Sequence, residues 1–257
     1  MSGRLPDGMI RRVAGPYAQN GFKVGFDWGP VGAEVVAGDI VAVVDVLSFT
    51  TAVTVAADLG IAVYPYQWRD QSAVAYAERW SAKLAVGRSE ARPGDVSLSP
   101  MTIRNSQGVN RLVLPSPNGS TIAKQLSDSG ATVIAVSLRN RRAAADWVRE
   151  QGPDQRVVAI AAGERWSDGS LRPAVEDLWG AGGFLSALDQ DGLSPEARAA
   201  VAAYDAVADE LPKLLHECAG GRELTQYGYP EDVAIAAEVD QSTSVPVLED
   251  GTMFRST

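Results

Sequence analysis

Cysteine and histidine are almost absent from this 257-residue sequence. The single cysteine, Cys218, cannot form an internal disulfide, which fits a reducing compartment, and we expect a cytoplasmic protein. The single histidine, His216, excludes a zinc site built on several histidines. A Ser-His-Asp hydrolase would have to use this one histidine, which we expect instead on the surface or in the packing of a helix.

Long apolar runs and an excess of positive charge are also missing. Residues 1–20 contain no hydrophobic segment of the kind that a secretory signal requires, and the most apolar run, residues 40–46, has the length of a strand. We therefore expect no membrane partner. The formal net charge of −9 argues against nucleic acid as a partner, because such binding needs a basic face.

An alternation of apolar strands and helices is the main pattern that is present. The expected strands lie at residues 22–26, 40–46, 61–66, 84–86, 111–114, 132–136 and 157–161. Asp70, Ser194 and Pro230 mark helix starts. The alternation predicts a three-layer α/β/α fold with a largely parallel or mixed central sheet.

The predicted organisation is simple. We expect an irregular N-terminal arm at residues 1–21 and a single α/β domain at residues 22–257. Residues 245–248 and 253–254 flank Asp-Gly, which predicts a terminal hairpin or an edge turn. Residues 87–110 form a long segment without helical period, and such loops often carry function.

A carboxylate ends the most apolar strand, and in open α/β sheets ligands bind beyond the carboxyl ends of strands. Asp45 stands at this strand end, and Thr50 and Thr51 open the next helix. Asp45 can bind Mg²⁺ or attack phosphorus, or it can merely cap the turn together with Thr50. The haloacid-type phosphatase pattern requires a second aspartate two residues later, where this sequence has Leu47.

Two further strand ends carry groups that suit an anion. The first consists of Asn118, Gly119, Ser120 and Thr121. Backbone N–H groups and hydroxyls there suit a phosphate or sulfonate, although an ordinary turn has the same composition. The second consists of Ser137, Arg139 and Asn140. Its arginine can grip an anion oxygen or lie on the surface beside an Asn cap.

A fourth strand end combines acids and arginines. It contains Gly163-Glu164-Arg165, then Arg172, and then the pair Glu176 and Asp177. Adjacent residues on a helix point in different directions, so we expect at most one of this acidic pair to bind a metal directly. Carboxylates, hydroxyls and arginines thus follow successive strands, which is the combination that Mg²⁺-assisted phosphoryl chemistry requires.

Seven short motifs in this order make the sequence resemble the 2-phosphosulfolactate phosphatase family. They are Val-Asp-Val-Leu-x-x-Thr-Thr (44–51), Ser-Pro (99–100), Asn-Gly-Ser (118–120), Ser-Leu-x-Asn (137–140), Glu-Asp-Leu-x-x-Ala-Gly (176–182), Gly-Arg-Glu-Leu (221–224) and Val-Pro-Val-Leu-x-Asp-Gly (245–251). No single motif is specific, whereas seven in order are much more so.

The resemblance implies a three-layer α/β/α fold and Mg²⁺-dependent hydrolysis of 2-phospho-3-sulfolactate, a step of coenzyme M synthesis. By position it points to a pocket formed by Asp45, Thr50, Thr51, Asn118, Gly119, Ser137, Asn140, Glu176 and Asp177. Three places depart from the usual family residues, namely Ser48-Phe49 for Arg-Ala, Gly87-Arg88-Ser89 for Gly-Glu-Arg, and Ser97-Leu98 for Gly-Asn. These departures bear on the substrate more than on the fold.

We therefore predict a phosphatase whose partner is a small anionic phosphorylated substrate. Asp45 with Glu176 or Asp177 is predicted to bind Mg²⁺ and carry the chemistry. The predicted anion contacts are Thr50, Thr51, Asn118, Gly119, Ser120, Thr121, Ser137, Asn140 and the arginines Arg88, Arg139, Arg165 and Arg172. The sequence leaves a homo-oligomer open.

Two alternatives accompany this prediction. Residues 87–91 fall short of the Gly-x-Ser-x-Gly elbow of a serine hydrolase, and Pro93-Gly94 prevents the helix that should follow it. The other alternative is a non-catalytic protein that binds a small anion or a nucleotide on the same scaffold. Neither a Gly-x-x-x-x-Gly-Lys-Ser/Thr loop nor a Gly-x-Gly-x-x-Gly turn is present in the sequence, which weakens its nucleotide version.

Overall fold

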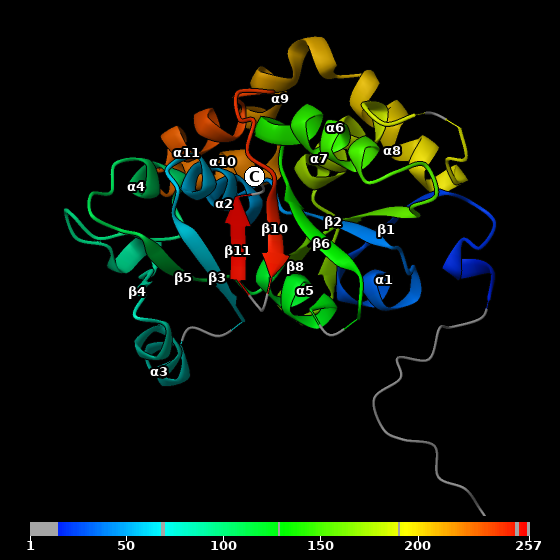
Figure 1. The fold of residues 1–257 in the computed structure, drawn as a ribbon. Helices are drawn as coiled ribbons and strands as arrows, with labels where there is room; N and C mark the ends of the chain where they lie inside the picture. Colours follow the sequence, from blue (N-terminus) through cyan, green and yellow to red (C-terminus); the bar gives the residue numbers. More distant parts are fainter. Residues whose placement is uncertain (1–14, 68–69, 128, 190, 250–251, 256–257) are drawn as a thin grey trace, which may run out of the picture.

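A nine-stranded mixed sheet forms the centre of the protein (Figure 1). The structure is a computed structural model that describes residues 15–67, 70–127, 129–189, 191–249 and 252–255. Four parallel strands make one side of the sheet, in the order β1 (Val24–Trp28), β7 (Val157–Ala161), β2 (Ile40–Val44) and β6 (Thr132–Val136). We call these strands the first strand group.

The other side of the sheet is a second strand group that is also parallel within itself. It consists of β3 (Ala62–Tyr66), β5 (Arg111–Pro115) and β4 (Lys83–Leu84). The expected strands therefore exist, and none of their ends differs from the predicted position by more than two residues. A separate two-stranded ribbon joins β8 (Glu164–Arg165) to β9 (Leu171–Arg172).

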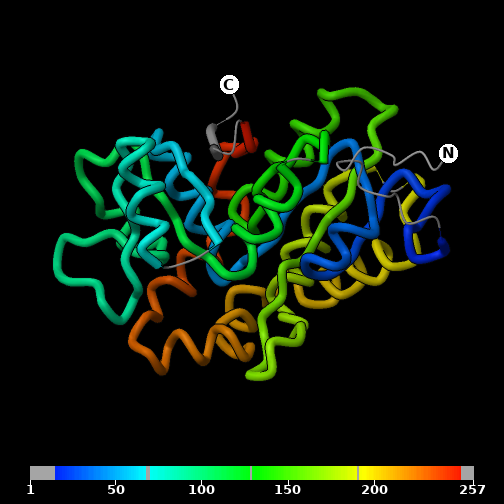
Figure 2. Tube along the Cα trace, turned by 90° about the horizontal axis from the view of Figure 1, so that it is seen from below, coloured from blue at the N-terminus to red at the C-terminus, as the bar shows by residue number. Residues whose placement is uncertain are grey.

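A hairpin joins the two strand groups in the middle of the sheet. Its strands are β10 (Pro246–Glu249) and β11 (Thr252–Arg255). β10 pairs antiparallel with β6 through Val247 and Ile134, and β11 pairs antiparallel with β3 through Met253 and Val63. Three antiparallel pairings in succession make the second strand group run opposite to the first. Figure 2 shows the red hairpin between the cyan-to-teal segment of β3 to β5 and the rest of the chain.

The structure confirms one of two expectations for this hairpin. The sequence predicted a terminal hairpin or an edge turn, and a hairpin is present at the C-terminal end of the chain, in the centre of the sheet rather than at its edge. Its Asp-Gly turn at residues 250–251 and the first 14 residues of the expected N-terminal arm lie outside the described residues. An edge strand exposes unpaired backbone groups, and the central position provides partners on both sides of the hairpin.

Helices cover both faces of the sheet, which confirms the predicted three-layer α/β/α fold (Figure 1). One face is covered by α1 (Gly29–Val35), α3 (Gln71–Trp80) and α5 (Gly119–Leu126). The other face carries α2 (Phe49–Asp58), α4 (Pro100–Arg104), α6 (Arg141–Glu150), α7 (Val175–Ser186), α8 (Pro195–Asp205), α9 (Leu211–Glu217), α10 (Ala219–Gln226) and α11 (Pro230–Ala236).

The alternation of side chains along β2 shows how one strand serves both layers. Ile40, Ala42 and Val44 belong to the core cluster beneath α6, α7 and α8, whereas Val41 and Val43 belong to the cluster beneath α1 and α5. Successive strand residues point to opposite faces, so a continuous apolar run is required when both faces are covered. Complete burial of each Val or Ile contributes about 1.5–3 kcal/mol.

Local capping explains where several helices begin. Asp70 accepts a hydrogen bond from the Ser72 N–H at 2.8 Å, and Ser194 Oγ accepts one from the Ala197 N–H at 3.1 Å, as the sequence predicted. The long segment 87–110 also contains α4, which begins at Pro100 after the Ser99 cap and was not predicted. Across the described ranges, no helix has the length and apolar character needed to cross a bilayer.

Candidate active site

Two threonines shape the turn that follows β2. Thr50 Oγ1 accepts a hydrogen bond from the Asp45 N–H at 3.0 Å and donates one to the Asp45 carbonyl oxygen at 2.8 Å. Thr51 Oγ1 donates to the Val46 carbonyl oxygen at 2.8 Å. Both side chains are fully buried. Their hydroxyls hold the backbone of the turn, rather than meeting an anion as predicted.

This turn directs the carboxylate of Asp45 toward the start of α5. Asp45 Oδ1 accepts the Phe49 N–H at 3.1 Å, and Oδ2 accepts the Gly119 N–H at 2.8 Å. A Cβ atom at position 119 would overlap the Phe49 ring and lie 2.7 Å from Asp45 Oδ2, so only glycine fits there. The predicted contact between these two strand ends is therefore present. The Gly119 N–H, however, donates to Asp45 rather than to an anion.

Asp177 ties two strand ends of the first group together. Its Oδ1 accepts the Val46 N–H at 2.7 Å, just after β2, and its Oδ2 accepts the Gly163 N–H at 2.9 Å, just after β7. Each oxygen of this buried carboxylate thus meets a backbone donor. Asp177 acts as a positioning residue for the two loops that carry Asp45 and Glu164.

Glu176 differs from its neighbour because one of its oxygens is left without a partner. Its side chain is 2% exposed, and Oε2 has no hydrogen bond among the described residues. The other oxygen lies so close to Gly220, at the start of α10, that a Cβ atom there would overlap it. The pair on α7 therefore divides into one anchored carboxylate and one carboxylate with a buried oxygen still available.

Glu164 is a functional candidate that the sequence did not single out. It follows Gly163 at the end of β7, and Asn118 Nδ2 donates a hydrogen bond to Glu164 Oε2 at 2.9 Å. This contact brings the loop after β5 to the loop after β7. Its position at a strand end could have identified Glu164 from the sequence. At this strand end we predicted functional roles only for the arginines and for the later acids, Glu176 and Asp177.

Burial is the first cause of the unusual acidities at this site. It raises the pKa of Asp45 to about 6, against the lowering effect of the Phe49 and Gly119 N–H groups and of the Arg88 charge. Burial and the charge of Asp45 raise the pKa of Glu164 to about 7. Burial and the charges of Asp45 and Glu176 raise the pKa of Asp177 well above its usual value. Asp45, Glu164, Glu176 and Asp177 form one interacting group, which we call the carboxylate cluster.

The carboxylate cluster lies beside a cavity of about 470 Å³. Its lining residues are Leu47, Arg88, Ser89, Glu164, Gly220, Glu223, Leu224, Tyr227 and Tyr229. Glu164 is the member of the cluster that lines this cavity, and Gly220 separates it from Glu176. We call it the Glu164 cavity. Its volume suits a small-molecule ligand.

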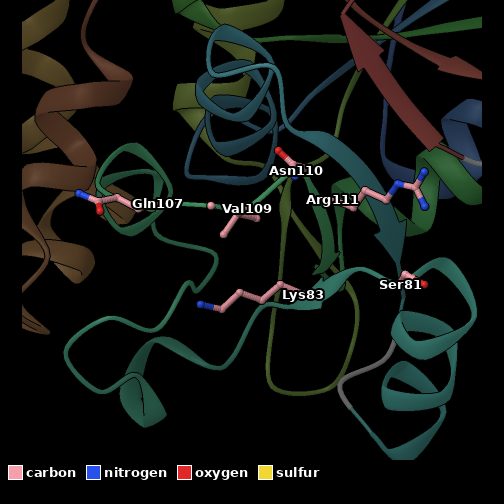
Figure 3. A pocket seen from close by; sticks show the side chains of 7 residues that line it. Ser81, Lys83, Gln107, Val109, Asn110 and Arg111 are labelled. Atoms are coloured by element: carbon pink, nitrogen blue, oxygen red, sulfur yellow. The ribbon is translucent and has the colours of Figure 1, made fainter.

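A second cavity, of about 550 Å³, lies away from the carboxylates (Figure 3). Its lining residues are Ser81, Lys83, Gln107, Gly108, Val109, Asn110 and Arg111. Figure 3 shows Lys83 extending below Gln107 and Val109. The cavity adjoins the amino ends of β4 and β5, whereas Gly119 follows the carboxyl end of β5. Although it is larger, it contains no acid that could perform the predicted chemistry.

The strand end after β6 does not join the carboxylate cluster. The Arg139 guanidinium lies 3.0 Å from Asp58 Oδ2 and 3.2 Å from Glu238 Oε2, at the C-terminal end of α2. Asn140 accepts the Ser137 N–H at 2.9 Å and donates to the Ser244 carbonyl oxygen at 3.0 Å. Ser137, Arg139 and Asn140, which we predicted as anion contacts, thus make hydrogen bonds and salt bridges within the protein.

The remaining predicted contacts fall into two sets. Ser120 Oγ donates to the Leu114 carbonyl oxygen, and Thr121 Oγ1 donates to the Pro117 carbonyl oxygen, so both serve the turn before α5. Arg165 is exposed and donates to the Gly169 carbonyl oxygen at 3.3 Å. Arg172 lies over the Trp166 ring, and its charge lowers the pKa of Glu164, so it stands close to the cluster.

Cys218 and His216 take no chemical role at this site. Burial, followed by the charge of Glu176, raises the pKa of the Cys218 thiol to about 12, so the thiol stays protonated. His216 is exposed on α9. An exposed histidine agrees with the predicted surface position, and it offers no support to the serine hydrolase alternative.

Comparison with known proteins identifies the family. A family model described as 2-phosphosulpholactate phosphatase matches residues 32–251. The chain belongs to this family. A probable 2-phosphosulfolactate phosphatase of Thermus thermophilus is 32% identical over 222 residues, which cover 82% of this chain and 88% of the relative. A protein of the same name from Microcystis aeruginosa is 25% identical over 229 residues, which cover 82% and 90%.

Membership in this phosphatase family confirms the predicted enzyme class, a phosphoric monoester hydrolase. The matched region includes every member of the carboxylate cluster. It also includes the Glu164 cavity. The functional question is therefore how this cluster handles a phosphate ester.

Two carboxylates of the cluster are oxygen donors of the kind that Mg²⁺ prefers. Within the described ranges, no group of three or more His, Cys, Asp or Glu side chains could hold a metal ion without further ligands. Mg²⁺ usually binds through one or two carboxylates and completes its octahedron with waters and substrate phosphate oxygens. Asp45 and Glu176 supply hard oxygen donors of this kind, and the unpartnered Glu176 Oε2 is a buried acceptor that needs a positive partner.

Proposed function

We propose that the protein is a Mg²⁺-dependent phosphatase that hydrolyses a phosphate monoester of a small acid, 2-phospho-3-sulfolactate or a related compound. The observation that carries the proposal is the carboxylate cluster beside a small cavity, with one buried Glu176 oxygen, Oε2, that has no hydrogen-bond partner in the described part of the chain. The family match and the names of the relatives, probable 2-phosphosulfolactate phosphatases, support the substrate.

In this proposal Asp45 and Glu176 hold the metal. Bound Mg²⁺ would neutralise the charge that develops on the phosphoryl oxygens. The Phe49 and Gly119 N–H groups fix the Asp45 carboxylate in one orientation, and Gly220 leaves room for the Glu176 carboxylate. Asp177 keeps the two loops in register without meeting the substrate.

Glu164 has the position and the acidity for proton transfer. It lines the cavity, Asn118 holds its carboxylate, and its pKa of about 7 allows both protonation states near neutral pH. A group with such a pKa can give a proton to the departing alkoxide oxygen and take one from water. We assign Glu164 this role.

The test is release of inorganic phosphate from a panel of phosphorylated small acids, including phosphosulfolactate, with Mg²⁺ and with a chelator. Asp45→Asn should lower kcat/KM by at least about 100-fold, because it removes a charged oxygen from the metal site. Asp205→Asn, which changes an exposed acid on α8, is the matched control and should keep full activity. Undiminished hydrolysis in the chelator, or by Asp45→Asn, contradicts the proposal.

A further inference from the structure

Among the residues that the structure describes, Arg88 is the only positively charged one that lines the Glu164 cavity. It belongs to the 3₁₀ turn Arg88–Glu90, which follows β4, so the second strand group brings it to the site. Its side chain is 19% exposed. Of the four arginines that the sequence offered for anion binding, this one lines the cavity beside the carboxylates.

A buried acid and a hydroxyl fix the orientation of this guanidinium. Arg88 Nε donates to Asp232 Oδ2 at 3.1 Å, and Nη2 donates to Ser48 Oγ at 2.6 Å. Asp232 is 1% exposed and is itself held, since its Oδ1 accepts the Ser99 hydroxyl and the Met101 N–H. The guanidinium is therefore part of a built site rather than a free surface chain.

One edge of the Arg88 guanidinium remains for a ligand. Nε and Nη2 carry the hydrogen bonds to Asp232, Ser48 and the Leu98 carbonyl oxygen, and Nη1 has none among the described residues. The Tyr229 ring lies 5.9 Å from the guanidinium carbon and forms part of the same wall. A guanidinium that is held on one edge keeps its donors on the other edge for an oxyanion.

The charges that line the cavity determine where a second anionic group of the substrate can bind. The carboxylate cluster repels any anion that a metal ion does not bind, and Glu223 adds negative charge to the cavity wall. A second anionic group on the substrate would therefore avoid the cluster. Arg88 and Glu164 line the same cavity, and Arg88 also contacts Ser48 in the turn that follows Asp45, so both positions are within reach of one small molecule.

We propose that Arg88, held by Asp232 and Ser48, binds the second anionic group of the substrate, a sulfonate or carboxylate, while the phosphate lies at the carboxylate cluster. The inference rests on the proposed function and restricts the substrate to phosphate esters that carry a second anionic group. It divides the Glu164 cavity into a metal and phosphate end and a guanidinium end. Arg88 is then a specificity-determining residue, and Asp232 is its positioning residue.

Equilibrium binding tests this division without requiring turnover. The titrants are 3-sulfolactate, lactate, isethionate and inorganic phosphate, each measured by calorimetry with Mg²⁺ present. Arg88→Met should weaken 3-sulfolactate binding about 10- to 100-fold, the usual worth of a hydrogen bond to a charged group. Phosphate binding should change by less than about twofold. Lactate and isethionate separate a carboxylate contact from a sulfonate contact, because each carries only one of them.

Arg104→Met is the matched control, because it removes another paired guanidinium, bound by Glu238, from outside the cavity. It should leave all four affinities unchanged. Asp232→Asn should weaken 3-sulfolactate binding and spare phosphate binding, which a general loss of folding would not do. Equal losses for phosphate and 3-sulfolactate in Arg88→Met, or no loss for either, overturn the proposal.

The kinetic form of the test separates this inference from the proposed function. Arg88→Met should raise KM for phosphorylated hydroxy acids by a much larger factor than KM for a simple alkyl phosphate, which has no second anionic group. If the wild-type protein hydrolyses none of these esters, the proposed function fails, while the binding measurements still decide the role of Arg88.

Discussion

At the scale of single residues, the site depends on hydrogen bonds that fix carboxylates in place. Asp177 shows this most directly, because its two oxygens accept N–H groups that follow two different strands. A carboxylate can do this for both donors at once. An amide cannot, since its nitrogen is itself a donor.

Asp177→Asn should therefore destabilise the protein and reduce activity. One buried N–H group, of Val46 or Gly163, would face another donor, at a cost of about 1–3 kcal/mol. Urea unfolding measures the stability and phosphate release measures the activity. Asp154→Asn, an exposed change, is the control. Unchanged stability of Asp177→Asn would show that the two loops do not depend on this carboxylate.

Residue by residue, the sequence predicted the site in part. The sequence placed Asp45 near Gly119 and near the acids of α7, and the hydrogen bonds of Asp45 and Asp177 agree with this. The reason differs for Gly119, because β5 runs opposite to β2 and their carboxyl ends do not share one edge of the sheet. The strand-end rule assigned ligand contacts to Thr50, Ser120 and Arg139, whose hydrogen bonds serve the backbone or a salt bridge instead. The direction of a side chain depends on three-dimensional neighbours such as Asp58, which sequence spacing does not reveal.

At the scale of elements, α7 shows how glycine allows close packing. This helix contains Gly180, Gly182 and Gly183, although each glycine costs about 1 kcal/mol in a helix relative to alanine. Gly180 lies against Val44 and Val46, and Gly182 lies against the backbone of α8 at Ala200. The same close approach places Glu176 and Asp177, at the start of α7, near the end of β2.

Gly182→Ala should destabilise the protein by about 1–3 kcal/mol, the usual range for overpacking. The new Cβ atom would overlap the Ala200 carbonyl oxygen and lie 2.9 Å from Tyr204 Cβ. Gly15→Ala is the matched control, because no atom lies within 4 Å of its new Cβ and its backbone is extended. The midpoint of urea unfolding measures both. Equal stability of the two variants would mean that α8 shifts without cost.

The elements themselves were the most predictable part of the protein. Strands such as β6 and β7 were predicted at their observed bounds, because a run of apolar residues between turns is a local signal. The central position of the β10–β11 hairpin was not predicted. Its neighbours β6 and β3 are distant in the chain, and sheet pairing between distant strands leaves little trace in a single sequence.

At the scale of the whole molecule, the carboxylate cluster couples stability to pH. The pKa values of Asp45, Glu164 and Asp177 are raised on folding. A carboxyl group with a raised pKa favours the folded state while it is protonated, and this contribution is lost as the pH rises through the folded pKa. The window lies between the unfolded values, near 4, and the folded values of about 6 and 7.

Without divalent metal, the thermal midpoint should therefore fall as the pH rises from about 5 to about 8, by roughly 2–8 °C for a chain of this size. Mg²⁺ should raise the midpoint more at the higher pH, because protons compete with the metal for the same oxygens. Glu164→Gln removes one titrating group and should flatten the pH dependence. A midpoint that rises over this interval would contradict the assignment.

Because the central hairpin joins the two strand groups, residues from both groups form the candidate active site. Asp45 stands on one group, and its Oδ2 receives an N–H group from Gly119, 74 residues away on the other. The guanidinium of Arg88 crosses the same boundary to reach Ser48. The proposed metal site and the proposed anion contact therefore both depend on the contact between the two strand groups. If that contact opened, Asp45 would lose the Gly119 N–H group and Arg88 would lose Ser48 at the same time.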